Sequence, residues 1–314
     1  MLTVSRLHRS ATDNPTVDSA PSAPDRRVAR RNVLSTPRSA RTQCDMAGDD
    51  QGGALRGGAI SRGVTRDGEI VRRPAGPWTL AVHSHLRRLT DAGQIVPEPL
   101  GVDGEEELLT YIDGTPLWMP GDPQYVDERT IRELGALLRC YHDVAETIGC
   151  ADDQTWNRLP TEPAGPHRII CHNDFAPWNV IRTSVGLSII DWDLAAPGTT
   201  DWDLAYASWV CAPLWNHDDV GARGLSPIPD RAERLAAFLD GYGASADQRV
   251  SLLDTLRARA AAAIDQAREW ATEGRTGWRQ QWSLPEPWRH GDGYRRDIDY
   301  FEEHWPEWKL AIVE

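Results

Sequence analysis

The sequence of 314 residues almost lacks lysine: of its 34 basic residues only Lys309 is a lysine, and it lies five residues from the C-terminus. Chemistry that needs a lysine must use this residue or replace it. Long apolar runs are also missing. The longest stretch without Asp, Glu, Lys or Arg is Leu204–His217, 14 residues that include Pro213, whereas a bilayer-spanning helix takes about 20 apolar residues. The sequence therefore predicts no membrane span and no membrane partner.

Paired cysteines are absent as well. The five cysteines, an odd number, are scattered between Cys44 and Cys211 with no C-x-x-C pair, which fits neither a disulfide framework nor a zinc site. We therefore expect a reducing, cytoplasmic location. The 47 acidic residues give a net charge of −13, and a negative surface repels phosphate backbones. The charge excludes a non-specific nucleic-acid binder, favours neutral or cationic partners and leaves the oligomeric state open.

The first 45 residues differ from the rest of the chain. Residues 1–42 carry eight Arg and three Asp, a net charge of +5. They have no sustained apolar period, so they bury too little surface to offset the entropy of ordering. We expect residues 1–45 to be a disordered tail, either a targeting segment or an extension ahead of a start at Met46. Residues 46–112 and 113–314 are then predicted to form two lobes.

Residues 52–111 show short apolar runs separated by turn signals. The Asp67-Gly68 turn predicts a β-hairpin. Apolar residues at helical spacing predict a helix over 78–90 with Thr79 as its cap, and Glu106–Ile112 predicts a strand. The glycine-rich residues 52–58 are either a linker or a phosphate cover. This order of elements is that of an α+β unit.

The remainder of the chain is mainly helical. Residues 127–144 keep the apolar pattern of one buried helical face, with Asp127 as the cap, and residues 231–242 and 248–272 predict two further helices. Between the first and second helix, Arg168–Ala205 is a non-helical centre. Within this centre, residues 179–182 and 187–190 are predicted to form a hairpin. The loop that enters the hairpin and the residue that follows it then lie at the same end of the hairpin.

Oxygen-bearing side chains gather at this end of the hairpin. Asp174 and Asn179 lie on the loop that enters its first strand, and Asp191 lies directly after its second strand. Two carboxylates and an amide oxygen are hard ligands, which suit Mg²⁺ with bound phosphate rather than zinc. Asp174 alone could be only a helix cap, but together with Asn179 and Asp191 it indicates a site that handles phosphate.

These motifs resemble the aminoglycoside phosphotransferase and choline kinase-like family, which has the protein-kinase-like fold. His172-x-Asp174-x-x-x-x-Asn179 is similar to the family's catalytic loop, and Ile190-Asp191-Trp192-Asp193 to its metal-binding segment, with Trp202-Asp203-Leu204-Ala205 following. The resemblance runs from about residue 57 to the C-terminus. It implies a two-lobed α+β fold, with a small β-rich nucleotide-binding lobe, a larger and mostly helical catalytic and substrate lobe, and ATP between them.

The resemblance also implies roles for single residues. Asp174 would deprotonate a substrate hydroxyl, while Asn179 and Asp191 would hold Mg²⁺ across the ATP phosphates. His172 would pack against the catalytic loop and hydrogen-bond it. Asp193 would contact a second metal ion or bond within its own segment.

Other positions are assigned in the same way. A hinge near residues 109–113 would place Tyr111 and Ile112 beside the nucleotide. Asp203 would cap a helix or brace the loop, and Asn173 stands where glycine is frequent in the family. Trp178 and Trp192 are expected to fill the core.

The sequence departs from the family at the lysine. The family has a lysine on the third strand of the small lobe, paired with an acid on the following helix, whereas this sequence offers Arg72 and Arg73 and a helix with His83 and His85. Arginine stays charged and binds phosphate bidentately. Strand alternation lets only one arginine face the cleft, and Arg72 is preferred because Val71 and Arg73 would share the opposite face.

The sequence thus predicts an ATP-dependent phosphotransferase that acts on a hydroxyl of a small molecule, such as an aminoglycoside or another cationic compound. Two alternatives stay open. The missing lysine is compatible with a non-catalytic, kinase-like nucleotide-binding protein. His172 and the nearby acids could also serve a metal-dependent phosphoesterase, although no further His or Glu cluster supplies a two-metal cage.

Overall fold

The computed structural model describes residues 63–119, 125–150, 155–157, 169–222, 225, 227–284 and 290–313. All of them belong to the second of the two units into which the chain divides, residues 1–42 and 43–314. The expectations for the tail at 1–45 and for the glycine-rich residues 52–58 lie outside the described residues and stay predictions.

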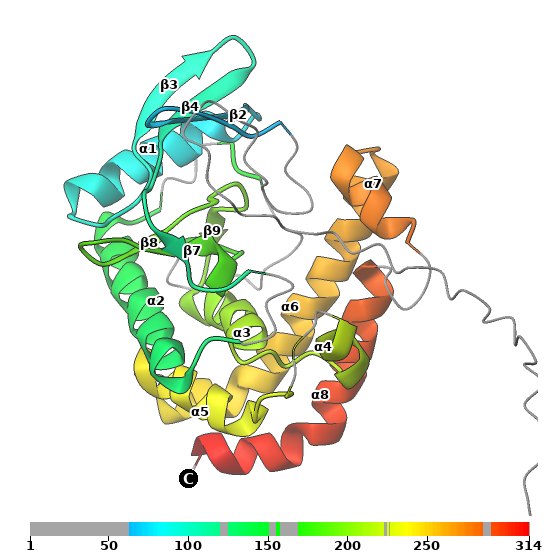
Figure 1. The fold of residues 1–314 in the computed structure, drawn as a ribbon. Helices are drawn as coiled ribbons and strands as arrows, with labels where there is room; N and C mark the ends of the chain where they lie inside the picture. Colours follow the sequence, from blue (N-terminus) through cyan, green and yellow to red (C-terminus); the bar gives the residue numbers. More distant parts are fainter. Residues whose placement is uncertain are drawn as a thin grey trace, which may run out of the picture. The chain divides into compact units, whose positions relative to one another are not determined.

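Strands are concentrated in the N-terminal part of the described chain, and helices dominate the remainder (Figure 1). The strands are β1 (Thr65–Asp67), β2 (Ile70–Pro74), β3 (Pro99–Asp103), β4 (Glu106–Thr110), β5 (Thr115–Pro116), β6 (Ile169–Cys171), β7 (Val180–Arg182), β8 (Leu187–Ile189) and β9 (Ala196–Gly198). The helices are α1 (Thr79–Asp91), α2 (Glu128–Ile148), the 3₁₀ turn η1 (Pro177–Asn179), α3 (Thr200–Cys211), α4 (His217–Ala222), α5 (Arg231–Tyr242), α6 (Ala246–Thr272), α7 (Thr276–Trp282) and α8 (His290–Val313). This is the predicted α+β class.

The first sheet has four antiparallel strands in the order β1-β2-β4-β3. The predicted hairpin is confirmed, and Gly68 in its turn has a φ of 60°, which glycine adopts without a Cβ clash. Strand β2 pairs with β4 so that Arg73 lies opposite Glu107. Strand β3 was not predicted. Its register against β4 shifts between Pro99 and Gly101, and this irregularity interrupts the alternation by which a strand is recognised.

Helix α1 covers the predicted range to within one residue at each end. Its N-cap is Trp78, so the assignment of Thr79 as the cap is wrong. The Thr79 hydroxyl instead accepts the backbone N–H of Gly76 at 2.9 Å. The side chains of Val82 and Leu86 are buried, which fixes the face that α1 presents to the core.

Residues 111–114 connect the first sheet to a second one. Strand β4 ends at Thr110, two residues before the predicted end at Ile112. Strand β5 pairs with β7, and β7 and β8 form the predicted hairpin. The lobe boundary predicted at 112/113 falls in this connection and stays a prediction.

Three helices of the C-terminal part, α2, α5 and α6, were predicted from the sequence pattern, whereas α3, α4 and α7 were not. Asp127 caps α2 by accepting the N–H of Thr130 at 2.8 Å, and α5 has the predicted ends. Helix α3 begins at Thr200 because the Thr199 side chain caps it, so the last residues of the predicted non-helical centre are helical. Helix α8 was not predicted, and it contains Pro306. None of the described helices is long and apolar enough to span a bilayer.

Helices α2 and α5 lie in close backbone contact at a pair of glycines. A Cβ atom on Gly135 would lie 2.2 Å from the carbonyl oxygen of Phe238, and one on Gly241 would lie 2.2 Å from that of Arg132. Neither position has room for a methyl group, and the opposing atoms are backbone atoms that cannot rotate away. The two glycines therefore set the separation of these helices.

We predict that Gly135→Ala lowers the free energy of unfolding by about 1–3 kcal/mol or more, because the helices must separate. Gly221→Ala is the matched control, since a Cβ at Gly221 meets no atom within 4 Å, and it is expected to be neutral or to stabilise by up to about 1 kcal/mol. Chemical denaturation of both variants measures the difference. Equal stability of the two variants would contradict the close packing.

Candidate functional site

Asp174 lies in the loop after β6, and both of its carboxylate oxygens accept hydrogen bonds. Oδ2 accepts from the Nδ2 of Asn179 at 3.0 Å, and Oδ1 accepts from the hydroxyl of Tyr206 at 2.6 Å. Asn179 ends the 3₁₀ turn that leads into β7, and Tyr206 lies on α3. Side chains from two elements thus hold the carboxylate in one orientation.

The surroundings of Asp174 change its proton affinity. Burial raises the pKa of Asp174 to about 7, and the charge of Asp191 acts in the same direction. The hydrogen bonds from Tyr206 and Asn179 and the charge of Arg259 lower this pKa by smaller amounts. A carboxyl group with a pKa near neutral pH can accept and release a proton there. Asp174 therefore has the chemistry expected of a general base.

His172 uses both ring nitrogens inside the protein. Its Nδ1 accepts the backbone N–H of Asp174 at 3.2 Å, and its Nε2 donates to the carbonyl oxygen of Ile190 at 3.0 Å. Burial lowers the pKa of His172, which keeps the ring neutral. This placement agrees with the packing and hydrogen-bonding role expected for His172 rather than with proton exchange with a substrate.

Asp203 braces the loop from α3. Its carboxylate accepts the backbone N–H groups of His172 and Asn173, each at 2.8 Å, and the Nε2–H of His142 at 3.1 Å. Burial acts to raise the pKa of Asp203, but the hydrogen bond and charge of His142 and the loop contacts outweigh it and lower the pKa. The Nδ1 of His142 is bonded to the hydroxyl of Tyr242 at 2.8 Å. Through these contacts Asp203 braces the loop, which is one of the two roles expected for it.

Two residues of the site have a left-handed backbone. Asn173 and Asp191 each have a φ of 63°, and within the described ranges no other non-glycine residue has a positive φ. Such a conformation costs about 1–2 kcal/mol and is concentrated at functional sites. The φ of Asn173 also gives a physical reason why glycine suits this loop position.

A buried arginine joins the first sheet to the acids after β8. The Nη1 of Arg73 donates to Asp191 at 3.1 Å, and its Nη2 forms an ion pair with Asp193 at 2.7 Å. Its Nε donates to Glu107, the residue opposite it on β4. His83 of α1 is bonded to the second oxygen of Glu107 at 2.9 Å. One guanidinium thereby connects β2, β4, α1 and the predicted metal-binding segment.

This arginine cluster holds more negative than positive charge. One guanidinium faces three carboxylates, a formal charge of −2 before any proton on His83. Burial raises the pKa of Asp193 to about 6; the charge of Arg73 opposes the rise, and those of Asp191 and Glu107 add to it. The pKa of Arg73 is raised because the three acids outweigh the effect of burial. A divalent cation is the kind of charge that would complete such a cluster.

The structure turns Arg73, and not Arg72, toward these acids, so the preference for Arg72 as the inward-facing residue is wrong. Arg72 lies on the other face of β2, where its Nη1 is 3.5 Å from Asp103 and 3.6 Å from Glu106. The reason is that Arg73 shares the face of Val71, which packs against the core. The covered face of β2 is therefore the one that contacts Asp191 and Asp193.

Glu107 and Tyr206 are site residues that the sequence motifs do not contain. Glu107 is 2% exposed and alternates in phase with the buried Leu109. A charged residue on the apolar face of a strand is a signal that could have revealed it. Tyr206 directly follows Ala205, and nothing in the sequence indicates that its hydroxyl reaches Asp174.

The predicted metal ligands Asn179, Asp191 and Asp193 lie at one end of the β7–β8 hairpin. The backbone N–H of Ile190 donates to the carbonyl oxygen of Asn179 at 2.9 Å, which ties the two motifs together. Because Asn179 donates to Asp174 through Nδ2, its amide oxygen is the atom it could offer a cation. Among the described residues no three His, Cys, Asp or Glu side chains form a metal cluster.

The predicted hinge residues Tyr111 and Ile112 follow β4. The backbone N–H of Tyr111 donates to the carbonyl oxygen of Glu69 at 2.8 Å, and the guanidinium of Arg66 lies 3.5 Å from the centre of its ring. Tyr111 is four residues beyond Glu107, which at 3.3 Å per residue is roughly 13 Å along the strand direction.

Comparisons with known proteins agree with this geometry. Residues 146–258 match the Phosphotransferase enzyme family. The chain is 33% identical over 199 residues to the trifolitoxin immunity protein of Rhizobium leguminosarum bv. trifolii, and the alignment covers 62% of this chain and 75% of that protein. The chain belongs to the phosphotransferase enzyme family.

Solved structures share the fold of this chain. A choline/ethanolamine kinase family protein from Mesorhizobium loti has a TM-score of 0.50 at 16% identity, over 82% of this chain and 90% of that one. The amicoumacin kinase hAmiN, solved with AMP-PNP, Ca²⁺ and Ami, has a TM-score of 0.53 at 11% identity, over 82% and 87%. The likeness confirms the two-lobed, protein-kinase-like α+β fold.

Arg73 lies on the strand where the family's lysine was expected, and its Nε donates to Glu107 of β4. Helix α1 contributes His83, which is bonded to the same carboxylate. These three side chains connect β2 with α1.

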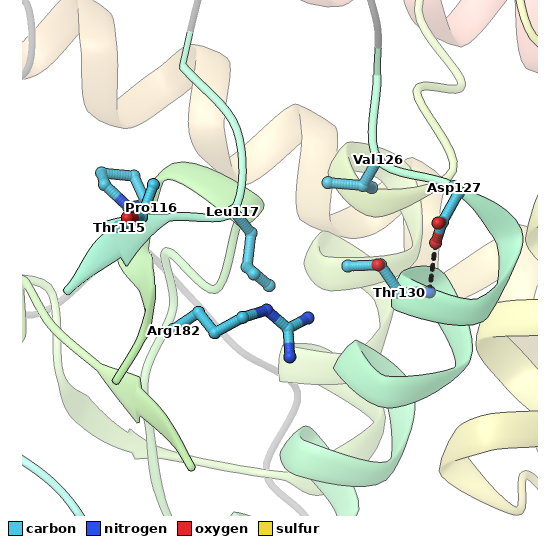
Figure 2. Close-up of a pocket in the computed structure, with 7 residues that line it drawn as sticks. All are labelled: Thr115, Pro116, Leu117, Val126, Asp127, Thr130 and Arg182. Atoms are coloured by element: carbon cyan, nitrogen blue, oxygen red, sulfur yellow. Dashed lines mark hydrogen bonds between the residues drawn. The ribbon is translucent and has the colours of Figure 1, made fainter. Parts of the chain in front are cut away.

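A cavity of about 230 Å³ lies beside the first turn of α2 (Figure 2). It is lined by Thr115, Pro116, Leu117, Val126, Asp127, Thr130 and Arg182. Figure 2 shows Arg182 extending from β7 toward this turn, and its Nη2 donates to Glu133 at 2.8 Å. None of the lining residues belongs to the arginine cluster or to the loop of Asp174, so the cavity is not part of the site.

Trp192 links α1 to the catalytic loop in the core. Its ring centre lies 4.6 Å from that of His172 and 5.7 Å from that of His85 on α1. The Nε2 of His85 donates to the hydroxyl of Tyr141 at 3.2 Å, which itself donates to the carbonyl oxygen of Ile170. Trp192 is 1% exposed, as predicted for a core residue. Two lines of contact therefore join α1 to the segment that carries Asp174.

His85 is buried in its neutral form. Burial lowers its pKa to about 3, with smaller contributions from Arg88 and His172, and its Nδ1 has no hydrogen-bond partner among the residues that the structure describes. Because the folded pKa is below the value of about 6.5 in an unfolded chain, the stability that neutral His85 contributes is complete above pH 6.5. It is lost as the pH falls from 6.5 toward 3.

We predict that His85→Leu makes the free energy of unfolding less dependent on pH between 6.5 and 4. The difference in slope between wild type and variant should be at most about 1.4 kcal/mol per pH unit, the value for one proton. Denaturation at a series of pH values measures it. Parallel pH profiles for the two proteins would show that His85 does not resist protonation.

Proposed function

We propose that the protein transfers the γ-phosphoryl group of ATP to a hydroxyl group of a small molecule. The observation that carries the proposal is the Asp174 carboxylate, oriented by Asn179 and Tyr206 and electrostatically coupled to Asp191 of the arginine cluster. Membership of the phosphotransferase enzyme family supports the same reaction class.

Asp174 acts on the acceptor. As the acceptor oxygen forms its bond to the γ-phosphorus, Asp174 takes the hydroxyl proton, and the bond from that phosphorus to the bridging oxygen breaks, so that ADP leaves. The hydrogen bond from Tyr206 to Oδ1 and that from Asn179 to Oδ2 keep the carboxylate from rotating. Its pKa of about 7 matches the task of accepting a proton at neutral pH.

Asn179, Asp191 and Asp193 fit Mg²⁺. Their oxygen atoms are the hard ligands that this ion prefers, and the arginine cluster beside them has a formal charge of −2. Held by these residues, Mg²⁺ would supply positive charge that offsets the negative charge developing during transfer. Asp191 and Asp193 would then share their oxygens between the ion and Arg73.

Arg73 contacts the ATP phosphates in the place of the missing lysine. Its two terminal nitrogens already lie at the acids that would hold the ion, and a guanidinium binds phosphate bidentately. Tyr111 and Ile112 lie further along the same strand direction, so a nucleotide would extend from the connection after β4 to Arg73. We infer a cytoplasmic location for the reaction, because ATP is present in the cytoplasm.

The acceptor is a hydroxyl-bearing toxin or antibiotic, of which a cationic compound such as an aminoglycoside is one class. The related protein is named for immunity to trifolitoxin, and phosphorylating a toxin is a direct way to protect a cell from it. The net charge of −13 favours a cationic acceptor.

One observation favours a second function, that of a non-catalytic nucleotide-binding protein. Arg73 is paired with three acids of the protein itself, an arrangement that could hold the fold together without taking part in chemistry. Measurements of turnover and of nucleotide affinity separate the two functions.

Replacing Asp174 by Asn should abolish phosphoryl transfer and leave ATP affinity within about threefold, because the carboxylate acts on the acceptor and not on the nucleotide. Loss of a general base costs about 100-fold or more. ADP formation with a panel of hydroxyl compounds measures transfer, and a fluorescent ATP analogue measures affinity.

Asp201→Asn is the control, since Asp201 lies on the same helix as Tyr206 and bonds only Gln248 in the contacts that the structure shows. It should retain wild-type turnover. Unchanged turnover in Asp174→Asn would remove Asp174 from the mechanism.

Arg73→Ala should weaken ATP binding about tenfold to a hundredfold, the effect of losing a charge-assisted contact of about 1.5–3 kcal/mol. Arg72→Ala should leave it unchanged, because Arg72 faces Asp103 and Glu106 on the other side of β2. Arg73→Lys retains the positive charge and guards against a variant that does not fold. Equal affinities in Arg73→Ala, Arg72→Ala and the wild type would refute the phosphate contact.

A further inference from the structure

Arg259 of α6 lies beneath the catalytic loop, far from it in the sequence. The side chain is 2% exposed, and its Nη2 donates to the backbone carbonyl oxygen of Asn173 at 2.9 Å. Its guanidinium also lies 4.6 Å from the ring centre of Tyr206 and 5.6 Å from that of Trp202. Arg259 follows directly after the last residue of the family match.

The carbonyl that Arg259 holds belongs to the peptide group before Asp174. The N–H of the same peptide group donates to the Nδ1 of His172 at 3.2 Å. Both polar atoms of this peptide are therefore restrained, one from α6 and one from the loop itself. Asn173 has a φ of 63°, a conformation that costs about 1–2 kcal/mol and would relax without such restraint.

Arg259 restrains the carboxylate by a second route. Tyr206 donates its hydroxyl to Oδ1 of Asp174 at 2.6 Å, and the guanidinium of Arg259 lies against the ring of this tyrosine. A cation over a tyrosine ring is attracted to it, more strongly where both are desolvated. The same side chain thus touches the backbone before Asp174 and the residue that orients its carboxylate.

We propose that Arg259 is a positioning residue for Asp174, which fixes the Asn173–Asp174 peptide and the Tyr206 ring from α6. The proposal rests on the proposed function in its catalytic part and on geometry alone in its structural part. It assigns Arg259 no contact with substrate. It predicts that Arg259 affects the chemical step and not the binding of the nucleotide, because Arg73, Asp191 and Asp193 are outside its contacts.

Arg231 provides a matched control. It is also a buried arginine, 6% exposed, which donates to the carbonyl oxygen of Pro213 at 3.1 Å and lies 4.8 Å from the ring centre of Tyr300. Its contacts are in the segment after α3, on α4 and on α8. Arg231→Met therefore removes the same kind of side chain and the same kind of contacts without touching the catalytic loop.

The experiment compares wild type, Arg259→Met, Arg259→Lys and Arg231→Met in two measurements. The first is amide hydrogen exchange of the residues 172–175, which needs neither nucleotide nor turnover. The second is ADP formation from Mg-ATP with the hydroxyl panel, analysed as kcat and as KM for ATP. Arg259→Lys keeps a charged donor, so it tests the proposal if Arg259→Met does not fold.

We expect Arg259→Met to raise exchange at 172–175 by about tenfold and to lower kcat by about tenfold to a hundredfold. The KM for ATP should stay within about threefold. Arg259→Lys should show smaller changes in exchange and in kcat than Arg259→Met. Arg231→Met should leave exchange at 172–175 and kcat per folded molecule unchanged.

Unchanged exchange at 172–175 in Arg259→Met would overturn the proposal, as would a kcat equal to that of Arg231→Met. If the wild type forms no ADP with any compound, the proposed function fails. The exchange measurement then decides the positioning role by itself.

Discussion

The buried guanidinium of Arg73 is the interaction on which the site depends. It bonds to Glu107 within its own sheet and to Asp191 and Asp193 beyond it, so the orientation of the predicted metal-binding segment follows from the position of β2. A lysine ammonium is a compact point charge, whereas the planar guanidinium presents donors in fixed directions. The replacement of lysine by arginine therefore fits a cluster in which three carboxylates are held by one side chain.

A second set of contacts holds the catalytic loop from the helical part of the chain. Asp203 accepts two backbone N–H groups of the loop, and His142 and Tyr242 extend this contact to α2 and α5. The two left-handed residues are Asn173, directly before Asp174, and Asp191, which Arg73 contacts. Removing one partner of a buried charged network costs about 3–5 kcal/mol. The left-handed backbone of these two residues therefore persists because contacts of this strength surround it.

The sequence predicted the features that depend on local pattern. The hairpin at Asp67-Gly68, the cap at Asp127 and helix α5 all follow from turn chemistry and apolar spacing within a few residues. The motif around Asp174 and that around Asp191 could be paired because a hairpin of known length joins them. In these places the chain has one physically reasonable local solution.

The remaining features depend on contacts between distant segments. Whether Arg72 or Arg73 faces the acids is decided by which face of β2 is covered by the rest of the protein, and both choices satisfy strand alternation. Tyr206 reaches Asp174, and Arg259 reaches the carbonyl oxygen of Asn173, only because α3 and α6 pack beside the loop, which no local pattern encodes. Helix α8 was missed because Pro306 lies inside it, and a proline normally marks a helix boundary.

Transfer of phosphate by this site, rather than nucleotide binding alone, can be measured by phosphorus NMR. The full chain is incubated with Mg-ATP and each member of a panel of cationic and neutral hydroxyl compounds. We expect at least one compound to yield ADP and a phosphate monoester in equal amounts. Nucleotide binding with ATP left intact for every compound, or conversion of ATP to ADP and free phosphate with no ester formed, would contradict it.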